Sequence, residues 1–431
     1  MRRWALFGMC LVLGACAAGI GLAPPPNLYR AGTNYPETNV PPSLRTAEPK
    51  IFYMTDRVPD DKDYGHDRSQ SMAFGAATVK FGRDLDWAEL LNRTRADSNE
   101  NISTLWVPDF EEIVRFESTP LPYERRDGRL RHQPDSRAKY DGQASQFQAV
   151  IANEIRQTGN KRLLIYIHGF NNDFEDSLTT IANIWHFAGR QTVPISFTWP
   201  AGNGAGPLGY FRDRDAGTFS VHHTKEFLRM LAAIPEVEQI DIIAHSRGTD
   251  VATTALRELM IEARGGGIHP KLALKTGTLI MAAPDLDVDI VRQRLQAELF
   301  SEAFEQINLY INPQDGALRL SAYLTRSVRL GALKDEDLQE GELALLAKEG
   351  LVHLIRVEDV RGGFGHAYFR DNPAVLSDVV LALRTRAFPG GTLRPLDQDE
   401  TGLWVLHSNY PLERLPDISI FDVREIERDD R

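Results

Sequence analysis

The stretch Ile240-Asp241-Ile242-Ile243-Ala244-His245-Ser246-Arg247-Gly248-Thr249 decides how the centre of this chain is interpreted. It joins a short apolar run, typical of a buried strand, to a segment from about Thr249 whose apolar residues recur at three-to-four spacing, as in a helix. The small residues Ala244 and Gly248 lie two positions on either side of Ser246, as a very tight strand-to-helix turn requires. The sequence therefore predicts a strand, a sharp turn that presents Ser246, and a helix.

The same alternation of an apolar run with a helical pattern repeats along the middle of the chain. The apolar runs cover residues 163–167, 193–199, 240–244, 279–283, 307–311 and 354–357, and helical patterns between them include 176–188, 221–233 and 249–263. Continuous apolar strands that alternate with helices are typical of a parallel sheet covered on both faces. We therefore expect an α/β fold with a mostly parallel, doubly wound sheet, extended by an N-terminal strand hairpin from residues 51–54 and 73–81.

The composition is that of an ordinary globular protein with an acidic balance. The 431 residues include 49 Lys+Arg and 60 Asp+Glu, which gives a net charge of -11, and 42% of them are hydrophobic. A chain of this size can bury a large core, and the composition excludes collagen-like, coiled-coil and wholly disordered proteins. We expect no nucleic-acid partner, because nucleic-acid binding needs a basic surface and the chain has no Lys/Arg block.

The first residues have the pattern of a targeting segment. Arg2 and Arg3 precede an apolar run over residues 4–13, which is too short for a bilayer span of about 20 residues. The run ends in Leu13-Gly14-Ala15-Cys16, which resembles the lipobox of bacterial lipoproteins. The resemblance implies a signal peptide over residues 1–15 and lipidation of Cys16; the alternative is a plain secretory signal. Ala17, rather than an acidic residue, then implies a lipid anchor in the outer membrane of the cell envelope, facing the periplasm.

The rest of the chain divides by composition into a tether, a main domain and an extension. Residues 16–49 are rich in proline and poor in aliphatic residues, which predicts an extended tether. The main domain is expected over 50–390 and a C-terminal extension over 391–431. The only cysteines, Cys10 and Cys16, leave with the signal or take the lipid, so the mature domain has no thiol for a disulfide, a nucleophile or a zinc site.

A nucleophilic Ser246 would need an acid and then a histidine base that follow it in the chain, because folds that present a serine on such a strand-to-helix turn order the three residues in this way. The histidines after Ser246 are His269, His353, His366 and His407. His366 lies in a glycine-rich loop just past the last apolar run, whereas the others lie before later strands, within a strand or in the tail. We therefore take His366 as the candidate base.

The acid is expected at the end of an intervening strand. Asp315 follows the run 307–311 and precedes Gly316, which makes it the first candidate, and Asp285 after residues 279–284 is the alternative acid. Cleavage of an ester or amide also needs N–H donors for the negatively charged oxygen of the tetrahedral intermediate, the oxyanion. The segment 168–172, His-Gly-Phe-Asn-Asn, follows another strand and is placed to supply one such donor. We assign the backbone N–H groups of Phe170 and Arg247 to that role. No ligand cluster has a metal-binding spacing, so we expect neither a metal nor a cofactor.

Two further stretches lie outside the alternation of apolar runs and helical patterns. Residues 202–217 are glycine-rich and polar and predict a loop at the carboxyl edge of the sheet, where open α/β sheets bind ligands. Residues 332–350 are charged and helix-prone, which indicates a surface helix or, alternatively, a lid.

Together these motifs resemble the α/β-hydrolase fold, and in particular a bacterial family of such hydrolases whose members mostly lack an assigned substrate. The resemblance rests on residues 168–172, Trp199-Pro200, Ala244–Gly248, Ala283-Pro284-Asp285 and Thr55-Asp56-Arg57, and covers about residues 50–385. It implies the α/β-hydrolase fold and a Ser-Asp-His triad.

These features predict a serine hydrolase that cleaves carboxylic esters at the bacterial cell envelope. Its partners would be a small-molecule or lipid ester and the membrane that holds its anchor. Two alternatives stay open: an acyltransferase or amidase that uses the same triad, and a non-catalytic binding protein of the envelope that keeps the fold. The sequence does not determine the oligomeric state.

Overall fold

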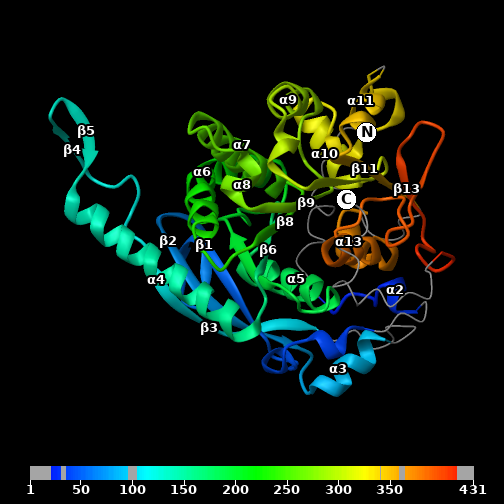
Figure 1. Ribbon diagram of the computed structural model, residues 1–431, viewed down its shortest axis with the longest axis horizontal. Helices are drawn as coiled ribbons and strands as arrows, with labels where there is room; N and C mark the ends of the chain where they lie inside the picture. Colours follow the sequence, from blue (N-terminus) through cyan, green and yellow to red (C-terminus); the bar gives the residue numbers. More distant parts are fainter. Residues whose placement is uncertain (1–20, 31–34, 96–103, 340, 359–364, 415–431) are drawn as a thin grey trace, which may run out of the picture.

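The computed structural model describes residues 21–30, 35–95, 104–339, 341–358 and 365–414, and an eleven-stranded sheet runs through it (Figure 1). The order of the strands across the sheet is β12-β13-β11-β10-β9-β8-β6-β7-β1-β2-β3. The strands are β1 (Lys50–Pro59), β2 (Tyr64–Phe81), β3 (Leu105–Arg115), β6 (Arg162–Ile167), β7 (Val193–Thr198), β8 (Gln239–His245), β9 (Thr276–Ala282), β10 (Gln306–Ile311), β11 (Val352–Val357), β12 (Asp397–Gln398) and β13 (Trp404–Leu406).

In this order, every pair of neighbouring strands between β13 and β1 is parallel. The antiparallel pairs lie at the two edges of the sheet. At one edge β1, β2 and β3 pair antiparallel, and at the other β12 pairs antiparallel with β13. The predicted α/β class, with its mostly parallel sheet and N-terminal hairpin, is confirmed. A separate hairpin, β4 (Tyr123–Arg126) with β5 (Arg129–His132), projects beyond the start of α4 (Figure 1).

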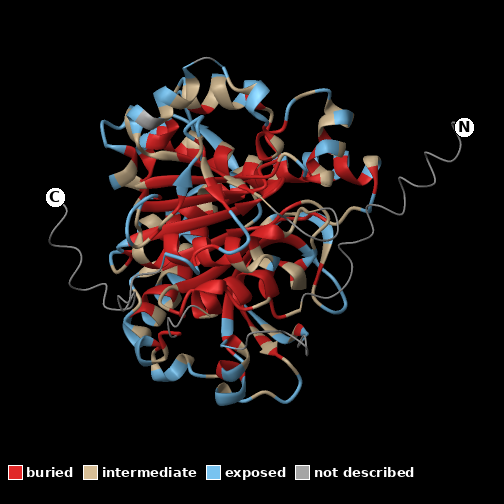
Figure 2. Cartoon of the chain, turned by 90° about the vertical axis from the view of Figure 1, so that its right-hand side faces the viewer, coloured by how far each residue is buried: buried red, intermediate tan, exposed pale blue. Residues whose placement is uncertain are grey.

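Helices cover both faces of the sheet. They are α2 (Asn27–Arg30), α3 (Trp87–Thr94), α4 (Pro134–Thr158), α5 (Phe174–Phe187), α6 (Pro207–Ala232), α7 (Gly248–Gly265), α8 (Pro270–Leu274), α9 (Val288–Val291), α10 (Gly316–Thr325), α11 (Glu342–Glu349), α12 (Tyr368–Asp371) and α13 (Pro373–Thr385). Because side chains alternate along a strand, Ile242 packs into the core shared with α4, α6 and α7, and Ile243 into the core shared with α5 and α13. The buried residues accordingly follow the sheet and the helix faces turned toward it (Figure 2).

The prediction of a loop over residues 202–217 holds only for residues 202–206, because α6 begins at Pro207. Pro207 suits the first helical position, where its fixed φ and missing N–H carry no penalty. Gly202, Gly204 and Gly206 lie in the loop before α6 and have left-handed φ values, whereas the two glycines inside α6 reflect close packing. A Cβ on Gly209 would lie 1.5 Å from the carbonyl oxygen of Gly204, and one on Gly217 would lie 3.0 Å from a methyl group of Val251.

The prediction of an extended tether over residues 16–49 also fails for the described part of that segment. Leu28 and Tyr35 are buried in the core shared with α5 and α13. The backbone N–H of Leu28 donates to Ser377 Oγ at 3.0 Å, and the amide of Asn27 donates to the carbonyl oxygen of Tyr410 at 2.9 Å. A few large apolar side chains, held in turns by the prolines, therefore bind the segment to the body. Residues 1–20, which include Cys16, lie outside the described residues.

The described part of the C-terminal extension also belongs to the body. Residues 391–414 carry β12 and β13, and Leu403 and Leu406 are buried. Among the described residues, no helix combines the length and hydrophobicity of a membrane span.

Candidate active site

Ser246 lies at a strained turn between β8 and α7. Its φ is +50°, a left-handed value that costs free energy for a residue with a side chain. Its backbone N–H donates to the carbonyl oxygen of Ala282 at 2.9 Å, which holds the turn against β9. A Cβ on Gly248 would lie 2.2 Å from the carbonyl oxygen of His168, so the second small position tolerates only glycine. The turn has the shape that the sequence predicts.

His366 and Asp315 lie next to Ser246, although both are distant from it in the chain. The Nε2 atom of His366 is 2.9 Å from Ser246 Oγ, and its Nδ1 atom is 2.7 Å from Asp315 Oδ2. Asp315 is fully buried at the first turn of α10, where its other oxygen accepts the N–H groups of Ala317 and Leu318 at 3.0 Å. The structure therefore brings the three side chains together as one hydrogen-bonded chain.

The electrostatics of the site distinguish His366 from its two neighbouring histidines. Burial disfavours a charged His366 imidazole, but the Asp315 carboxylate more than offsets this, so the pKa of His366 is raised above its ordinary value. Burial, with Arg57 nearby, lowers the pKa of His168 to about 3. Burial also lowers the pKa of His245 well below its ordinary range, with the His366 imidazole as a second cause. His168 and His245 therefore stay neutral near pH 7.

Asp285, the alternative acid, has different partners. Ser321 Oγ donates to it at 2.7 Å, Tyr210 Oη donates at 2.9 Å, and Arg329 forms an ion pair with it at 3.4 Å. None of the described hydrogen bonds joins Asp285 to His366. The side chain leaves the end of β9 toward α6 and α10, which explains why an equally suitable position in the sequence leads to a different contact.

The segment 168–172 runs directly against the serine turn. A Cβ on Gly169 would lie 2.9 Å from Ser246 Cβ and 2.9 Å from His245 Nδ1, so this position requires glycine. Phe170 follows in the loop, and Arg247 immediately precedes α7. The two backbone groups assigned to an oxyanion site therefore belong to two segments in contact with each other, one packed against Ser246 and the other directly following it in the chain.

A buried aspartate that the sequence analysis missed supports this segment. Asp213 on α6 accepts the backbone N–H groups of Asn171 at 2.9 Å, Gly202 at 3.1 Å and Asn203 at 3.0 Å. The side-chain amide of Asn203 adds a fourth donor at 2.9 Å. Because Asp213 falls in a stretch expected to be a polar loop, no pattern in the sequence distinguished it from an exposed carboxylate.

Arg57 on β1 supports the other side of the same segment. Its guanidinium donates to the carbonyl oxygens of Asn172 at 2.8 Å and Ala201 at 3.0 Å, and to Thr198 Oγ1 at 2.8 Å. Burial lowers its pKa to about 10, so it remains charged at neutral pH. The only signal in the sequence was its place in Thr55-Asp56-Arg57, to which the sequence analysis gave no role.

The strained serine turn between a parallel strand and a helix, in a doubly wound sheet, defines this protein as an α/β hydrolase by fold. The chain belongs to the family described as alpha/beta hydrolase of unknown function (DUF900), whose model matches residues 143–384. The predicted family resemblance is thus confirmed, and the matched range contains Ser246, Asp315 and His366. None of the curated proteins matches the chain. Within the described ranges, no three His, Cys, Asp or Glu side chains gather as a metal site requires.

Proposed function

We propose that this protein is a serine hydrolase that cleaves carboxylic esters, with Ser246 as nucleophile, His366 as base and Asp315 as the orienting acid. The observation that supports it best is the continuous hydrogen-bonded chain from Asp315 through His366 to Ser246, with distances of 2.7 and 2.9 Å. A module that only binds ligands has no need for a strained serine joined to a buried carboxylate. Esters are proposed by analogy with the common chemistry of this architecture.

In the first step His366 Nε2 accepts the proton of Ser246 Oγ as the oxygen bonds to the ester carbonyl carbon. The carbonyl π electrons move to the carbonyl oxygen, and the N–H groups of Phe170 and Arg247 stabilise the resulting oxyanion. Loss of one such donor typically costs about 2.7 to 4 kcal/mol of transition-state stabilisation. The bond to the leaving alkoxide then breaks, and the proton on Nε2 passes to it to form the alcohol.

In the second step water replaces the alcohol. His366 Nε2 takes a proton from the water as its oxygen attacks the acyl carbon, and the bond to Ser246 Oγ breaks. The proton returns to Ser246, and the carboxylic acid is released. Asp315 stays ionised throughout and holds the ring in the tautomer whose Nε2 atom accepts a proton.

A fluorophosphonate probe, located by peptide mass spectrometry, tests this proposal on the full chain carrying Cys16→Ser to prevent lipidation. We expect an adduct on Ser246 that disappears in Ser246→Ala and in His366→Ala. His222→Ala, which removes an exposed histidine of α6, serves as the control and should label normally. A folded wild-type protein that never labels would contradict the proposal and favour a binding protein. Labelling without ester turnover, but with transfer to an added amine or alcohol, would favour an acyltransferase.

We also propose that the domain is held at the cell envelope by lipid on Cys16. The support is the lipobox-like sequence Leu13-Gly14-Ala15-Cys16. Attached acyl chains contribute about 0.8 kcal/mol per buried CH₂, so several chains make a lasting anchor. Cells fed radiolabelled palmitate should label the wild-type protein and leave Cys16→Ser unlabelled; equal labelling of the two proteins would overturn the anchor.

A further inference from the structure

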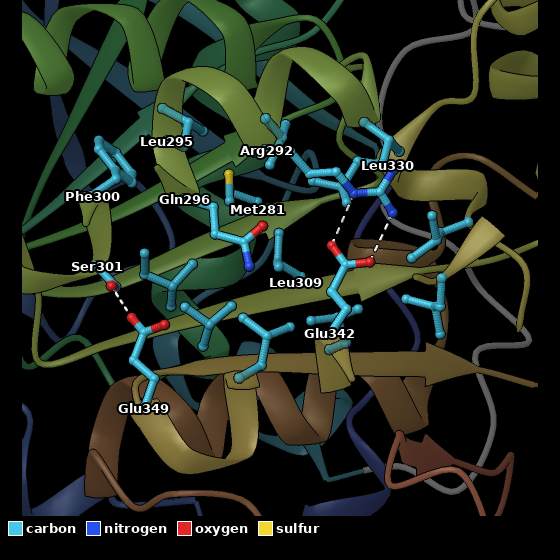
Figure 3. Close-up of a pocket in the computed structure, with 18 residues that line it drawn as sticks. Met281, Arg292, Leu295, Gln296, Phe300, Ser301, Leu309, Leu330, Glu342 and Glu349 are labelled. Carbon is cyan, nitrogen blue, oxygen red and sulfur yellow. Dashed lines mark hydrogen bonds and ion pairs between the residues drawn. The ribbon is translucent and has the colours of Figure 1, made fainter. Parts of the chain in front are cut away.

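A cavity of about 90 Å³ lies between strands β9–β11 and the segments that connect them, and none of its lining residues belongs to the proposed triad (Figure 3). Its apolar lining comes from Met281, Val288, Val291, Leu295, Phe300, Ile307, Leu309, Leu330, Leu333, Leu338, Leu346, Val352 and Leu354. The polar residues of the lining are Arg292, Gln296, Ser301, Glu342 and Glu349.

Helix α11 covers this cavity. Glu342, Leu346 and Glu349 line the cavity from one side of the helix, whereas Leu345 is 53% exposed. Two polar contacts join the helix to the opposite wall. The Arg292 guanidinium donates to both carboxylate oxygens of Glu342, at 3.0 and 2.7 Å, and the Ser301 hydroxyl donates to Glu349. The helix predicted within residues 332–350 therefore covers this cavity rather than lying on a solid surface.

The cavity is large enough for more than one water molecule, since about 10 to 15 Å³ of such volume holds one. It is smaller than a cavity of about 150 Å³ that holds benzene, but it is partly open to solvent, so part of a longer ligand can lie at its mouth. Thirteen of its eighteen lining residues are apolar, so most of the wall offers water no hydrogen-bonding partner, and buried water is stable only where it makes several such bonds. Aliphatic side chains with a few polar groups are typical of sites for small apolar ligands. Among the described residues that line the cavity, Phe300 is the only one with an aromatic ring, which favours a flexible alkyl chain over a flat ring system.

The polar groups of the cavity select the head group of such a ligand. Glu342 neutralises Arg292, so this arginine is not free to pair with an anion. Glu349 adds a carboxylate, which disfavours a second negative charge nearby. The side-chain amide of Gln296 lies among the apolar side chains (Figure 3), and it can both donate and accept a hydrogen bond.

We propose that this cavity binds the alkyl chain of a neutral aliphatic molecule, such as a fatty alcohol, with the hydroxyl held by the Gln296 amide. This site is independent of the proposed ester hydrolysis.

The probes are 1-octanol and octanoate, which differ in the charge of the head group, titrated calorimetrically at pH 8 into the full chain carrying Cys16→Ser in detergent-free buffer. We expect octanol to bind and to raise Tm, and octanoate to bind about tenfold more weakly or not at all. Equal affinity for the two probes, or no octanol binding, would overturn the proposal.

Two variants of α11 locate the site. Leu346→Trp fills the cavity and should weaken octanol binding by about tenfold, whereas Leu345→Trp, on the exposed side of α11, should bind as the wild type does. Equal binding by these two variants would overturn the assignment. Because a filled cavity can disturb folding, Gln296→Leu provides a second test that removes only the polar group and should also weaken octanol binding. Fluorophosphonate labelling of all three variants should match wild type, which keeps this test separate from that of the hydrolase.

Discussion

The carboxylate of Asp315 joins the imidazole of His366 to the first turn of α10: one oxygen lies 2.7 Å from His366 Nδ1, and the other accepts two backbone N–H groups of the helix. The N–H groups of the helix N-terminus hold the carboxylate in place, and the carboxylate fixes the orientation of the ring. Ser246 lies on the far side of that ring, at Nε2. The position of the proposed base is thus determined by a helix cap 51 residues earlier in the chain.

Replacing Asp315 should remove most of the activity, whereas replacing Asp285 should not. We expect Asp315→Asn to lower kcat by about 10³- to 10⁴-fold, because an amide favours the wrong tautomer of His366. Asp285 accepts hydrogen bonds from Tyr210 and Ser321, and Asp285→Asn should change the kcat of the folded protein by less than about tenfold. Ester turnover of both variants, corrected for folded protein by circular dichroism, checks this. The reverse order of effects would assign the acid to Asp285.

The pH dependence of Ser246 modification should report the raised pKa of His366. Below that pKa the imidazole is protonated and accepts no proton from Ser246, so the rate of fluorophosphonate inactivation falls as pH decreases. The midpoint of this fall should lie above 6.5, the ordinary value for histidine. In Asp315→Asn the burial of His366 is no longer offset, and the midpoint should move to lower pH. A midpoint that stays in place in Asp315→Asn would contradict the proposed pairing.

The Asp213 carboxylate should matter for turnover through the loop that it supports. Each Asp213 oxygen accepts two N–H groups, so in Asp213→Asn the new NH₂ group faces two donors whichever way the amide is turned. We expect this to lower the free energy of unfolding by about 1 to 3 kcal/mol. We also expect kcat to fall about tenfold or more with KM less affected, since the loop carries the proposed oxyanion donor Phe170. Asp215→Asn, at an exposed position of the same helix, is the control and should change stability by less than about 0.5 kcal/mol. Wild-type kcat in folded Asp213→Asn would show that this aspartate has no part in turnover.

The two ends of α7 should respond in opposite ways to a glycine-to-alanine change. Gly248→Ala places a Cβ 2.2 Å from the carbonyl oxygen of His168 and should destabilise the protein and abolish labelling of Ser246. Gly265→Ala meets nothing within 4 Å and should stabilise the protein by up to about 1 kcal/mol, because alanine is the better helix former. Denaturant unfolding of the two variants measures both effects. Similar stabilities for the two variants would show that the turn relaxes to admit a side chain.

The sequence by itself determined the class of fold and the order of its central elements. The apolar runs at 163–167, 240–244 and 307–311 became β6, β8 and β10 with shifts of a few residues at most. Periodicity of this kind is local, because the burial of a strand or of one helix face is repeated in neighbouring residues. The small residues around Ser246 were visible for the same reason, since a tight turn constrains positions close in the chain.

Only the tertiary structure decided which of these residues meet. Asp285 and Asp315 both follow apolar strands, yet only Asp315 contacts His366, because the choice depends on how α10 leaves the sheet. No local pattern indicates what Arg57 and Asp213 contact, since their partners lie in distant segments. The N-terminal segment has too few apolar residues for a periodic signal, but Leu28 is buried against α13 and α5. Contacts between distant segments arise from the packing of the whole chain, so patterns of neighbouring residues do not predict them.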